Sequence, residues 1–257
     1  MNIINIILFL LSLLILHTPS YGEENATLPN LVESHIETCR ERYGKGNFAE
    51  AISACTKALE IDPQLTTAYY IRGNVRLAQG DIDRAIEEYS KAIKLDSKYV
   101  IAYNGRGVAW YSKGEYGQAI DDFLKAIEIN QNYDQALNNL AWLYATCPVA
   151  KFINGKKAIK LAEKAISLGE MNDTFLAIVY YKTLAAAQAQ NGGFKTAVKT
   201  EADVAAWLEY DGYTDMLTES KLRLKKYKSK QQWRTKETII IKDMSGAGLI
   251  IYREPIL

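Results

Sequence analysis

The sequence predicts an all-α protein, a solenoid of stacked helix–turn–helix units. Three heptapeptides match one another at intervals of 34 residues: GNFAEAI begins at Gly46, GDIDRAI at Gly80 and GEYGQAI at Gly114. A period of this length is typical of helix pairs that stack into a solenoid. Apolar side chains also recur at helical spacing across residues 85–95. The heptapeptides therefore mark turns, and the segments on either side of each turn are helices.

The predicted helices are short, at about 12–14 residues each, a length at which an isolated helix is barely stable in water. Neighbouring helix pairs must therefore hold them in place. Such a stack offers other polypeptides a long groove, and it does not normally contain a catalytic pocket.

The side-chain sizes in the units follow the pattern of a known family. Small residues recur at equivalent places: Gly73 and Gly107 in first helices, and Ala51, Ala85 and Ala119 in second helices. Small residues let two helix backbones approach closely, and large ones fill the space between pairs. With these residues the chain resembles the tetratricopeptide repeat, a 34-residue pair of antiparallel helices. The resemblance implies a right-handed superhelix in which the first helix of each pair lines the concave face.

Five repeats and a cap are expected. The units are 32–65, 66–99 and 100–133, followed by the divergent 134–172 and 178–211. A basic helix over 212–236 caps the last repeat, with an apolar side made of Met216, Leu217, Leu222, Leu224 and Tyr227. Residues 237–257 are predicted to form a strand-like tail, in which the β-branched run 238–241 and the apolar run 249–252 flank a glycine turn. The tail could be a small β-hairpin or a disordered segment.

The N-terminus resembles a signal peptide covering residues 1–22. Residues 3–16 are apolar apart from Asn5 and Ser12, and a helix of that length is too short to cross a bilayer of about 30 Å comfortably. Ser20 and Gly22 have the small side chains that precede a cleavage site, so cleavage is expected after Gly22. Because no Lys or Arg precedes the run, an uncleaved anchor helix is the alternative. The mature protein is expected to be secreted or periplasmic, where disulfides can form.

The charge distribution is uneven. The chain carries a net charge of +1, which gives no general attraction to nucleic acid. Residues 221–257 alone carry +7. The segment Lys221–Lys236 could therefore contact an anionic membrane or the cell envelope peripherally.

The sequence lacks the residues that catalysis or metal binding would need. Its two histidines are His17, inside the signal peptide, and His35, which is expected to be a partly buried helix residue. It has no phosphate-binding loop. Acidic residues near the helix starts are expected to face solvent: Asp81, Asp83, Glu87, Glu88, Asp121 and Asp122. We predict a protein that is not an enzyme and that binds no metal and no cofactor.

The three cysteines have different expected roles. Cys39 and Cys55 fall on the two facing helices of the first unit, at inward positions. In an oxidising compartment they could form a disulfide, and otherwise they are two buried thiols. Cys147 begins the long loop of the fourth unit, and its role is interpreted as structural.

The resemblance assigns a set of residues to the concave face as a partner-binding groove: Ile36, Arg40, Tyr43, Tyr70, Asn74, Leu77, Asn104, Val108, Tyr111, Asn138 and Trp142. Rigid aromatic rings supply apolar contact, and asparagines can bond the backbone of an extended peptide. The alternative is that some of these side chains pack against a neighbouring helix or the C-terminal tail.

Four arginines take the place of the family's usual leucine or tyrosine: Arg42, Arg72, Arg76 and Arg106. They could pair with acids on the adjoining helix or form a basic strip, and the sequence leaves both open. The lysine and asparagine clamp that some family members use for a terminal carboxylate is not reproduced, since Ile36, Ile71 and Ile101 occupy its positions.

Two functions are consistent with these features. The first is an exported scaffold that binds a protein or peptide segment in its concave groove. The second is a module of the envelope or membrane surface that uses the basic C-terminal segment.

Overall fold

The computed structural model describes residues 28–169 and 174–234 and shows an all-helical solenoid. The helices in these ranges are α2 Leu28–Gly44, α3 Phe48–Ile61, α4 Thr66–Ala78, α5 Ile82–Leu95, α6 Val100–Lys113, α7 Tyr116–Ile129, α8 Asp134–Thr146, α9 Gly155–Leu168, α10 Thr174–Gln190, α11 Phe194–Tyr210 and α12 Thr214–Lys228, with a short 3₁₀ turn at Ala150–Phe152. No strand occurs among the described residues. The predicted signal peptide at residues 1–22 and the predicted hairpin in 237–257 lie outside these ranges.

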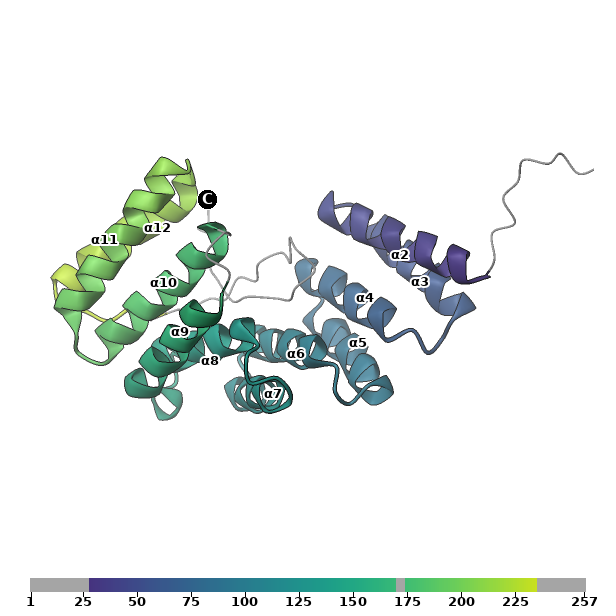
Figure 1. Ribbon diagram of the computed structural model, residues 1–257, viewed down its shortest axis with the longest axis horizontal. Coiled ribbons are helices and arrows are strands. Elements are labelled where there is room, and N and C mark those ends of the chain that lie inside the picture. Colours follow the sequence, from purple (N-terminus) through teal and green to yellow (C-terminus); the bar gives the residue numbers. More distant parts are fainter. Residues whose placement is uncertain (1–27, 170–173, 235–257) are drawn as a thin grey trace, which may run out of the picture.

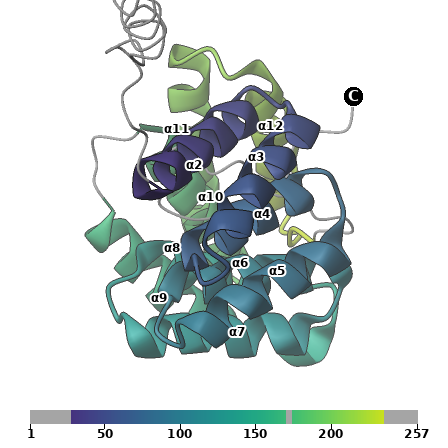
Figure 2. The same cartoon turned by 90° about the vertical axis from the view of Figure 1, so that its right-hand side faces the viewer.

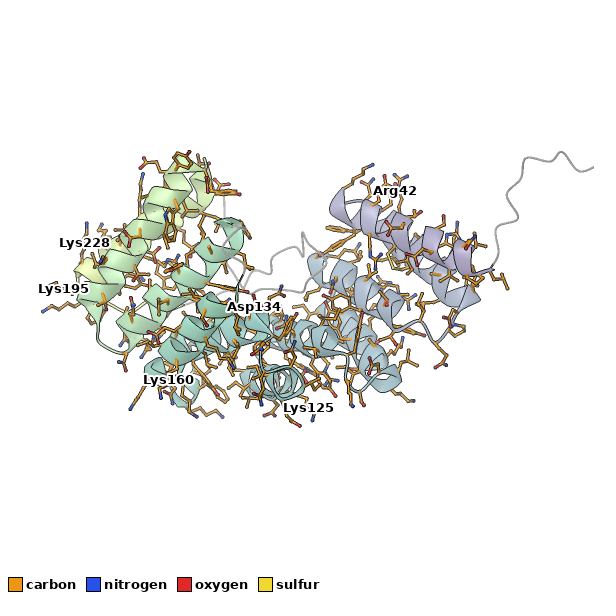
Figure 3. The ribbon with its side chains drawn as sticks, in the orientation of Figure 1. Arg42, Lys125, Asp134, Lys160, Lys195 and Lys228 are labelled. Carbon is orange, nitrogen blue, oxygen red and sulfur yellow. A yellow bond between two sulfur atoms is a disulfide. The ribbon has the colours of Figure 1, made fainter. Side chains whose placement is uncertain are left out.

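Successive helices pack as pairs, α2 with α3 through α10 with α11, and α12 packs on α11. The pairs form a curved array in which α4 and α6 lie toward the concave side, and α5 and α7 lie toward the convex side (Figure 1). Figure 2, viewed from the first pair, shows the later pairs stacked behind it. Charged side chains such as Lys125 and Lys160 point outward from the convex side (Figure 3).

The turn inside each pair explains the glycine of the heptapeptides. Gly114 has φ +85°, a left-handed conformation that suits glycine because it has no Cβ. The Gly114 N–H donates to Tyr111 O and the Glu115 N–H donates to Trp110 O, which closes the helix in a Schellman motif. Gly46 and Gly80 end α2 and α4 in the same way.

The turn between pairs also repeats every 34 residues. The side-chain oxygens of Asp62, Asp96 and Asn130 each accept a hydrogen bond from the backbone N–H two residues later, at 2.8–3.0 Å. These Asx turns stabilise the reversal without help from proline. This accounts for the retained turn geometry where Ser97 and Gln131 stand in place of Pro63.

Aromatic rings fill the places that the small residues leave. Tyr89 is fully buried between α4 and α6, and a Cβ added to Gly73 or Gly105 would come within 2.7 Å or 2.9 Å of its ring. Phe123 occupies the equivalent place beside Gly107. The predicted role of these glycines, which is close approach of packed helices, is consistent with this geometry.

The arginines in the repeats pair with acids. Arg72 donates to both carboxylate oxygens of Glu88, and Arg106 donates to both of Asp122. The expectation that Glu88 and Asp122 face solvent is therefore wrong: both are buried, because each lies under the first helix of its own repeat. Their partners are 16 residues away on the facing helix, in agreement with the expectation that the arginines could pair with acids on the adjoining helix.

Each of these arginines also reaches the preceding repeat. Arg72 donates to Thr56 Oγ1 at 2.9 Å, and Arg106 donates to Ser90 Oγ at 3.0 Å. The other two arginines form ion pairs as well, Arg42 with Glu50 and Arg76 with Asp81. The arrangement favours ion pairing over an unpaired basic strip.

The first pair is cross-linked. Cys39 on α2 and Cys55 on α3 form a disulfide, with their Cα atoms 5.4 Å apart. His35, one turn earlier on α2, is partly buried. Cys147 is a buried free thiol, and its burial raises its pKa.

The cap differs from the prediction on one side. Met216 and Tyr227 of α12 are buried as expected, but Leu222 is 55% exposed. Arg223 is buried in its place, because Glu201 of α11 supplies a carboxylate beneath it. An apolar stripe drawn from hydrophobicity alone could not include an arginine that pairs inside the core.

Candidate binding surface on the concave side

The predicted groove residues lie on α2, α4, α6 and α8, the helices that line the concave side. All of them except Arg40 are buried, with 8% or less of each residue's surface exposed. Arg40 is exposed and donates to Glu37 on its own helix. The structure thus brings the predicted set together along one side, and in this conformation that side is closed to solvent.

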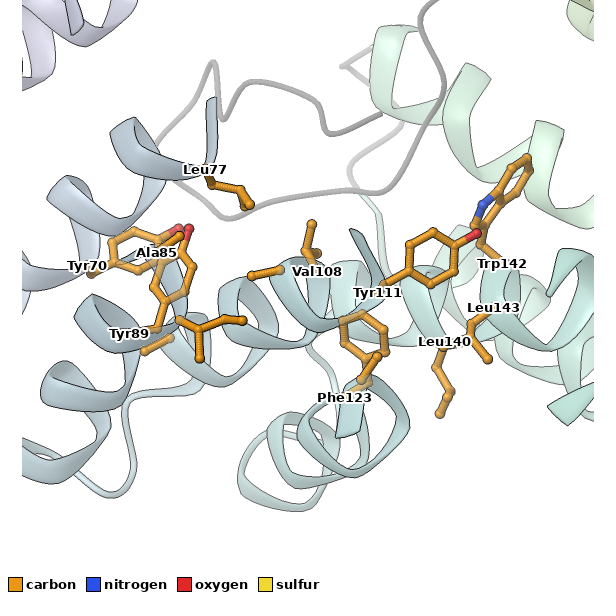
Figure 4. Close-up of a cluster of buried hydrophobic side chains, with 14 of the residues drawn as sticks. Tyr70, Leu77, Ala85, Tyr89, Val108, Tyr111, Phe123, Leu140, Trp142 and Leu143 are labelled. Carbon is orange, nitrogen blue, oxygen red and sulfur yellow. The ribbon is translucent and has the colours of Figure 1, made fainter. Parts of the chain in front are cut away.

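The apolar members form the wall of this inner face. Figure 4 shows Leu77, Val108 and Trp142 extending toward the concave side, while Phe123 lies beneath, between α6 and α7. Tyr70 packs edge-on against Tyr99, with ring centroids 5.9 Å apart, and Tyr111 packs likewise against Tyr116 at 5.5 Å. The tyrosine rings are therefore part of the scaffold as well as part of the surface.

Two of the three predicted asparagines are engaged within the scaffold. Asn74 Oδ1 accepts a hydrogen bond from the Tyr89 hydroxyl at 2.8 Å. Asn104 Oδ1 accepts one from Asn139 Nδ2 at 2.9 Å, which joins α6 to α8. Asn139 was not predicted, although it directly follows Asn138, because a helix turns adjacent residues toward different neighbours.

Asn138 is different from the other two. Its residue is fully buried on α8, and neither Nδ2 nor Oδ1 has a hydrogen-bond partner among the described residues. An unsatisfied buried amide typically costs about 1–3 kcal/mol. A carboxamide offers a donor and an acceptor side by side, which is the complement of a peptide unit.

A hydrogen bond from the α10 side borders this site. The Tyr180 hydroxyl donates to Asp134 Oδ2 at 2.9 Å, one turn before Asn138 on α8. Asp134 lies near the middle of the molecule in Figure 3. The contact fixes the start of α8 against α10 and so positions the Asn138 turn.

The most perturbed titratable groups lie elsewhere, in a buried ionic cluster between α10, α11 and α12. Arg223 is 3.0 Å from Glu201 Oε1, which also accepts from Ser220 Oγ at 2.6 Å. Lys182 donates to Glu219 Oε2 at 3.4 Å. Burial, helped by the nearby Arg223 charge, lowers the pKa of Lys182 to about 8.

This cluster holds the cap in place. All four charged residues are at most 4% exposed, so no substrate reaches them in this conformation. Glu201 occupies the position of Tyr89 and Phe123 in the second and third units, and this departure is a sequence signal for the cluster. Burial raises the pKa of the Glu201 carboxyl.

The described residues give no sign of a metal centre or a membrane span. No group of three His, Cys, Asp or Glu side chains in these ranges could hold a metal ion. No helix in the same ranges is both long and apolar enough to cross a bilayer.

Comparison with known proteins identifies the repeats. Models described as tetratricopeptide repeat match residues 43–65 and 100–133, and a model described as TPR repeat matches 73–112. The described helix pairs form a solenoid of the tetratricopeptide type. These matches fall on the helix pairs from α2 to α7, which contain the glycine turns and the arginine–acid pairs.

Several solved structures, two of them described as TPR or tetratricopeptide repeat proteins, resemble the fold of most of the chain. The crystal structure of MamA protein is 26% identical, with a TM-score of 0.53, over 72% of this chain and 96% of that one. A thermophilic TPR protein of Thermus thermophilus is 19% identical, with a TM-score of 0.57, over 77% and 98%. A tetratricopeptide repeat protein of Parabacteroides merdae is 17% identical, with a TM-score of 0.58, over 78% and 74%. No curated protein matches the sequence.

Tetratricopeptide repeats are generally non-catalytic and bind protein partners, and the fold of this chain supports a role as a protein-interaction scaffold. We call the concave side of α4, α6 and α8 the inner face; its side chains include Leu77, Val108, Tyr111, Asn138 and Trp142.

Proposed function

We propose that this chain is an exported, non-enzymatic scaffold that binds an extended peptide segment along its inner face. The observation that carries the proposal is the Asn138 amide, which is buried without a partner among the described residues and lies between apolar walls. The backbone of an extended peptide has N–H and C=O groups that match it, and apolar side chains that match Val108 and Trp142.

The alternative role for Asn138 is purely structural, and its energetics argue against that role. A side chain kept only for packing would be better as leucine, because replacing an unsatisfied amide by an apolar group of similar shape is neutral or stabilising. A ligand that satisfies the amide gives a physical reason for keeping it.

A selection from random peptides displayed on phage tests the binding surface. We expect the parent chain to select a peptide that binds about tenfold more weakly to the Asn138→Leu variant, because one amide pairing is worth about 1.4 kcal/mol in this comparison. The free energy of unfolding of that variant should equal or exceed the parent value. Equal peptide affinity for both proteins would overturn the assignment of Asn138.

A matched control is available on the opposite side. Leu124 of α7 is 46% exposed, so Leu124→Ala changes an apolar side chain without touching the inner face. The selected peptide should bind this variant as it binds the parent. A loss there would place the binding surface on the convex side.

Export is the second part of the proposal. The apolar run at residues 3–16, the small residues before Glu23 and the disulfide of the first pair all support it, since disulfides persist in oxidising compartments. Mass spectrometry of the protein recovered from expressing cells should show a chain that starts at Glu23. A chain that retains Met1 would overturn cleavage.

The membrane-surface function is a second candidate, favoured by the exposed side of α12. Lys221, Lys225, Lys226 and Lys228 are exposed there, and they surround the exposed Leu222. Basic and apolar groups side by side suit an anionic lipid surface. Binding to vesicles containing phosphatidylglycerol should weaken as salt rises and should fall in a variant with these lysines changed to glutamine. Salt-independent binding or no binding would exclude this function.

A further inference from the structure

The inner face is closed even though it lies on the concave side of the solenoid. Val108 and Asn138 are fully buried, and Tyr111 and Trp142 are at most 3% exposed. Their side of the helices is opposite the side on which the second helices pack, as Phe123 on α7 illustrates (Figure 4). These side chains are therefore shielded from solvent on the side away from the second helices.

The described chain ends next to that face. After α12 the chain folds back, and the Trp233 ring is buried beneath Arg223 and Lys226, which lie 5.8 Å and 5.0 Å from its centroid. The Arg234 guanidinium then donates to the carbonyl oxygen of Ala145 at 3.4 Å and to Gln190 Oε1. Ala145 is on α8, one turn after Trp142.

The segment that follows has the length and composition to cover the face. Residues 235–257 add 23 residues after this anchored point. Crossing from α8 over α6 to α4 takes roughly 20 Å, at about 10 Å per helix, which is about six or seven extended residues. The first apolar run, 238–241, begins four residues after Arg234 and consists of Thr and three Ile, residues that favour extended backbone.

We propose that residues 237–252 dock in cis across the inner face of α8 and α6. Their isoleucine side chains cover Val108 and Trp142, and their backbone lies over the Asn138 turn. A partner peptide must displace this segment before it binds, so the tail acts as an internal competitor. The competition rests on the proposed function, whereas the docking does not.

Site-specific photo-cross-linking in the full chain tests the docking. The variant Tyr111→benzoylphenylalanine keeps an aromatic ring on the inner face and attacks nearby C–H bonds on irradiation. We expect a product of monomer mass whose digest joins position 111 to a peptide within 237–252. Placing the same group at Leu124, on the convex side, should give no product with those residues.

Two results would overturn the docking. A product of dimer mass would show that the tail of a second copy covers the face. Efficient cross-linking from position 111 to described helices, with no product in 237–252, would show that the tail lies elsewhere.

A tail variant connects the docking with the competition. Ile239→Asp together with Ile241→Asp changes one side of an extended run outside the described helices, so the helical circular dichroism should be unchanged. We expect the monomer-mass product to fall at least about tenfold and the affinity for the phage-selected peptide to rise by a similar factor. An unchanged cross-link would contradict the docking.

The two proposals can fail separately. If the cross-link forms but no peptide is selected even by the Ile239→Asp/Ile241→Asp variant, the docking stands and the peptide-binding function falls. If a peptide is selected but no tail cross-link forms, the function stands and the docking falls.

Discussion

Arg106 on α6 holds Asp122 on α7 through two parallel hydrogen bonds, Nε to Oδ2 and Nη2 to Oδ1, each 2.8 Å long. The same arrangement joins Arg72 to Glu88 one repeat earlier. A bidentate pair of this kind fixes both distance and orientation between the two helices. Its effect on stability is asymmetric, because loss of one partner leaves the other charge buried.

Substitution of Arg106 by Met should therefore lower the free energy of unfolding by about 3 kcal/mol, because the Asp122 carboxylate would remain buried without its partner. The measurement is urea denaturation followed by circular dichroism. The double variant Arg106→Met/Asp122→Leu is the control and should recover most of the loss. A single variant as stable as the parent would show that the pair contributes nothing.

Substitution of Gly107 by Ala should lower the free energy of unfolding by about 1–3 kcal/mol, because the new Cβ would lie 2.6 Å from the buried Phe123 ring. Helix propensity alone would give the opposite sign, by up to about 1 kcal/mol in favour of alanine. The control is Gly117→Ala in α7, where the nearest atom is 3.9 Å away, and this variant should be stabilised. If both variants gain stability in thermal denaturation, the close approach at Gly107 is not restrictive.

Reduction of the Cys39–Cys55 disulfide should destabilise the first helix pair by about 3 kcal/mol. The bond closes a loop with a sequence separation of 16 and so lowers the conformational entropy of the unfolded chain. Thermal denaturation with and without reductant measures the difference. The variant Cys39→Ala/Cys55→Ala should match the reduced protein. Thiol titration of the oxidised chain after denaturation should find Cys147 alone, and three reactive thiols would contradict the bond.

The stability of the cap should depend on pH through Lys182. Its folded pKa of about 8 lies below the ordinary value of 10.5, so in this window the unfolded chain keeps a proton that the folded chain releases. The free energy of unfolding should therefore rise with pH across the window, by up to about 3 kcal/mol in total. Denaturation between about pH 8 and pH 9.5 avoids most tyrosine ionisation.

The variant Lys182→Met is the control for this titration, because it keeps the length of the side chain and removes the proton. Its overall stability can differ, since Glu219 keeps only Arg223 as a partner, so the slopes are compared and not the values. The variant should lack the rise. Parallel slopes in both proteins would assign the pH dependence to another group.

The sequence was sufficient to predict the helix pairs, because the turn glycines and the small packing residues are imposed by backbone geometry and recur in each unit. Gly114 must adopt a left-handed conformation wherever the unit ends in that turn, and Gly73 must accommodate the Tyr89 ring. Such requirements act on single positions and therefore appear directly in a single sequence.

The burial of charged groups was not predictable in the same way. Glu88 was expected to face solvent, and Arg223 was not among the residues of the predicted apolar side of the cap. Helical spacing on one helix contains no information about the facing helix. Their partners lie 16 and 22 residues away. The burial of the candidate binding surface could not be predicted for the same reason. Its residues were assigned from one face of each helix, whereas their burial depends on the rest of the chain.

The hydroxyl contacts of the two arginines have a mechanical consequence. Two hydrogen bonds link the first three repeats: Arg72 donates to Thr56 of the repeat before it, and Arg106 donates to Ser90 of the repeat before it. A pulling force on the first three pairs is therefore shared among them. The next equivalent position is Leu140, which is buried and cannot make such a link. When the solenoid is stretched from its ends, the first three pairs should extend as one stiff block. The seam between α7 and α8 should yield first, because the Asn139–Asn104 hydrogen bond crosses this boundary without an equivalent arginine link.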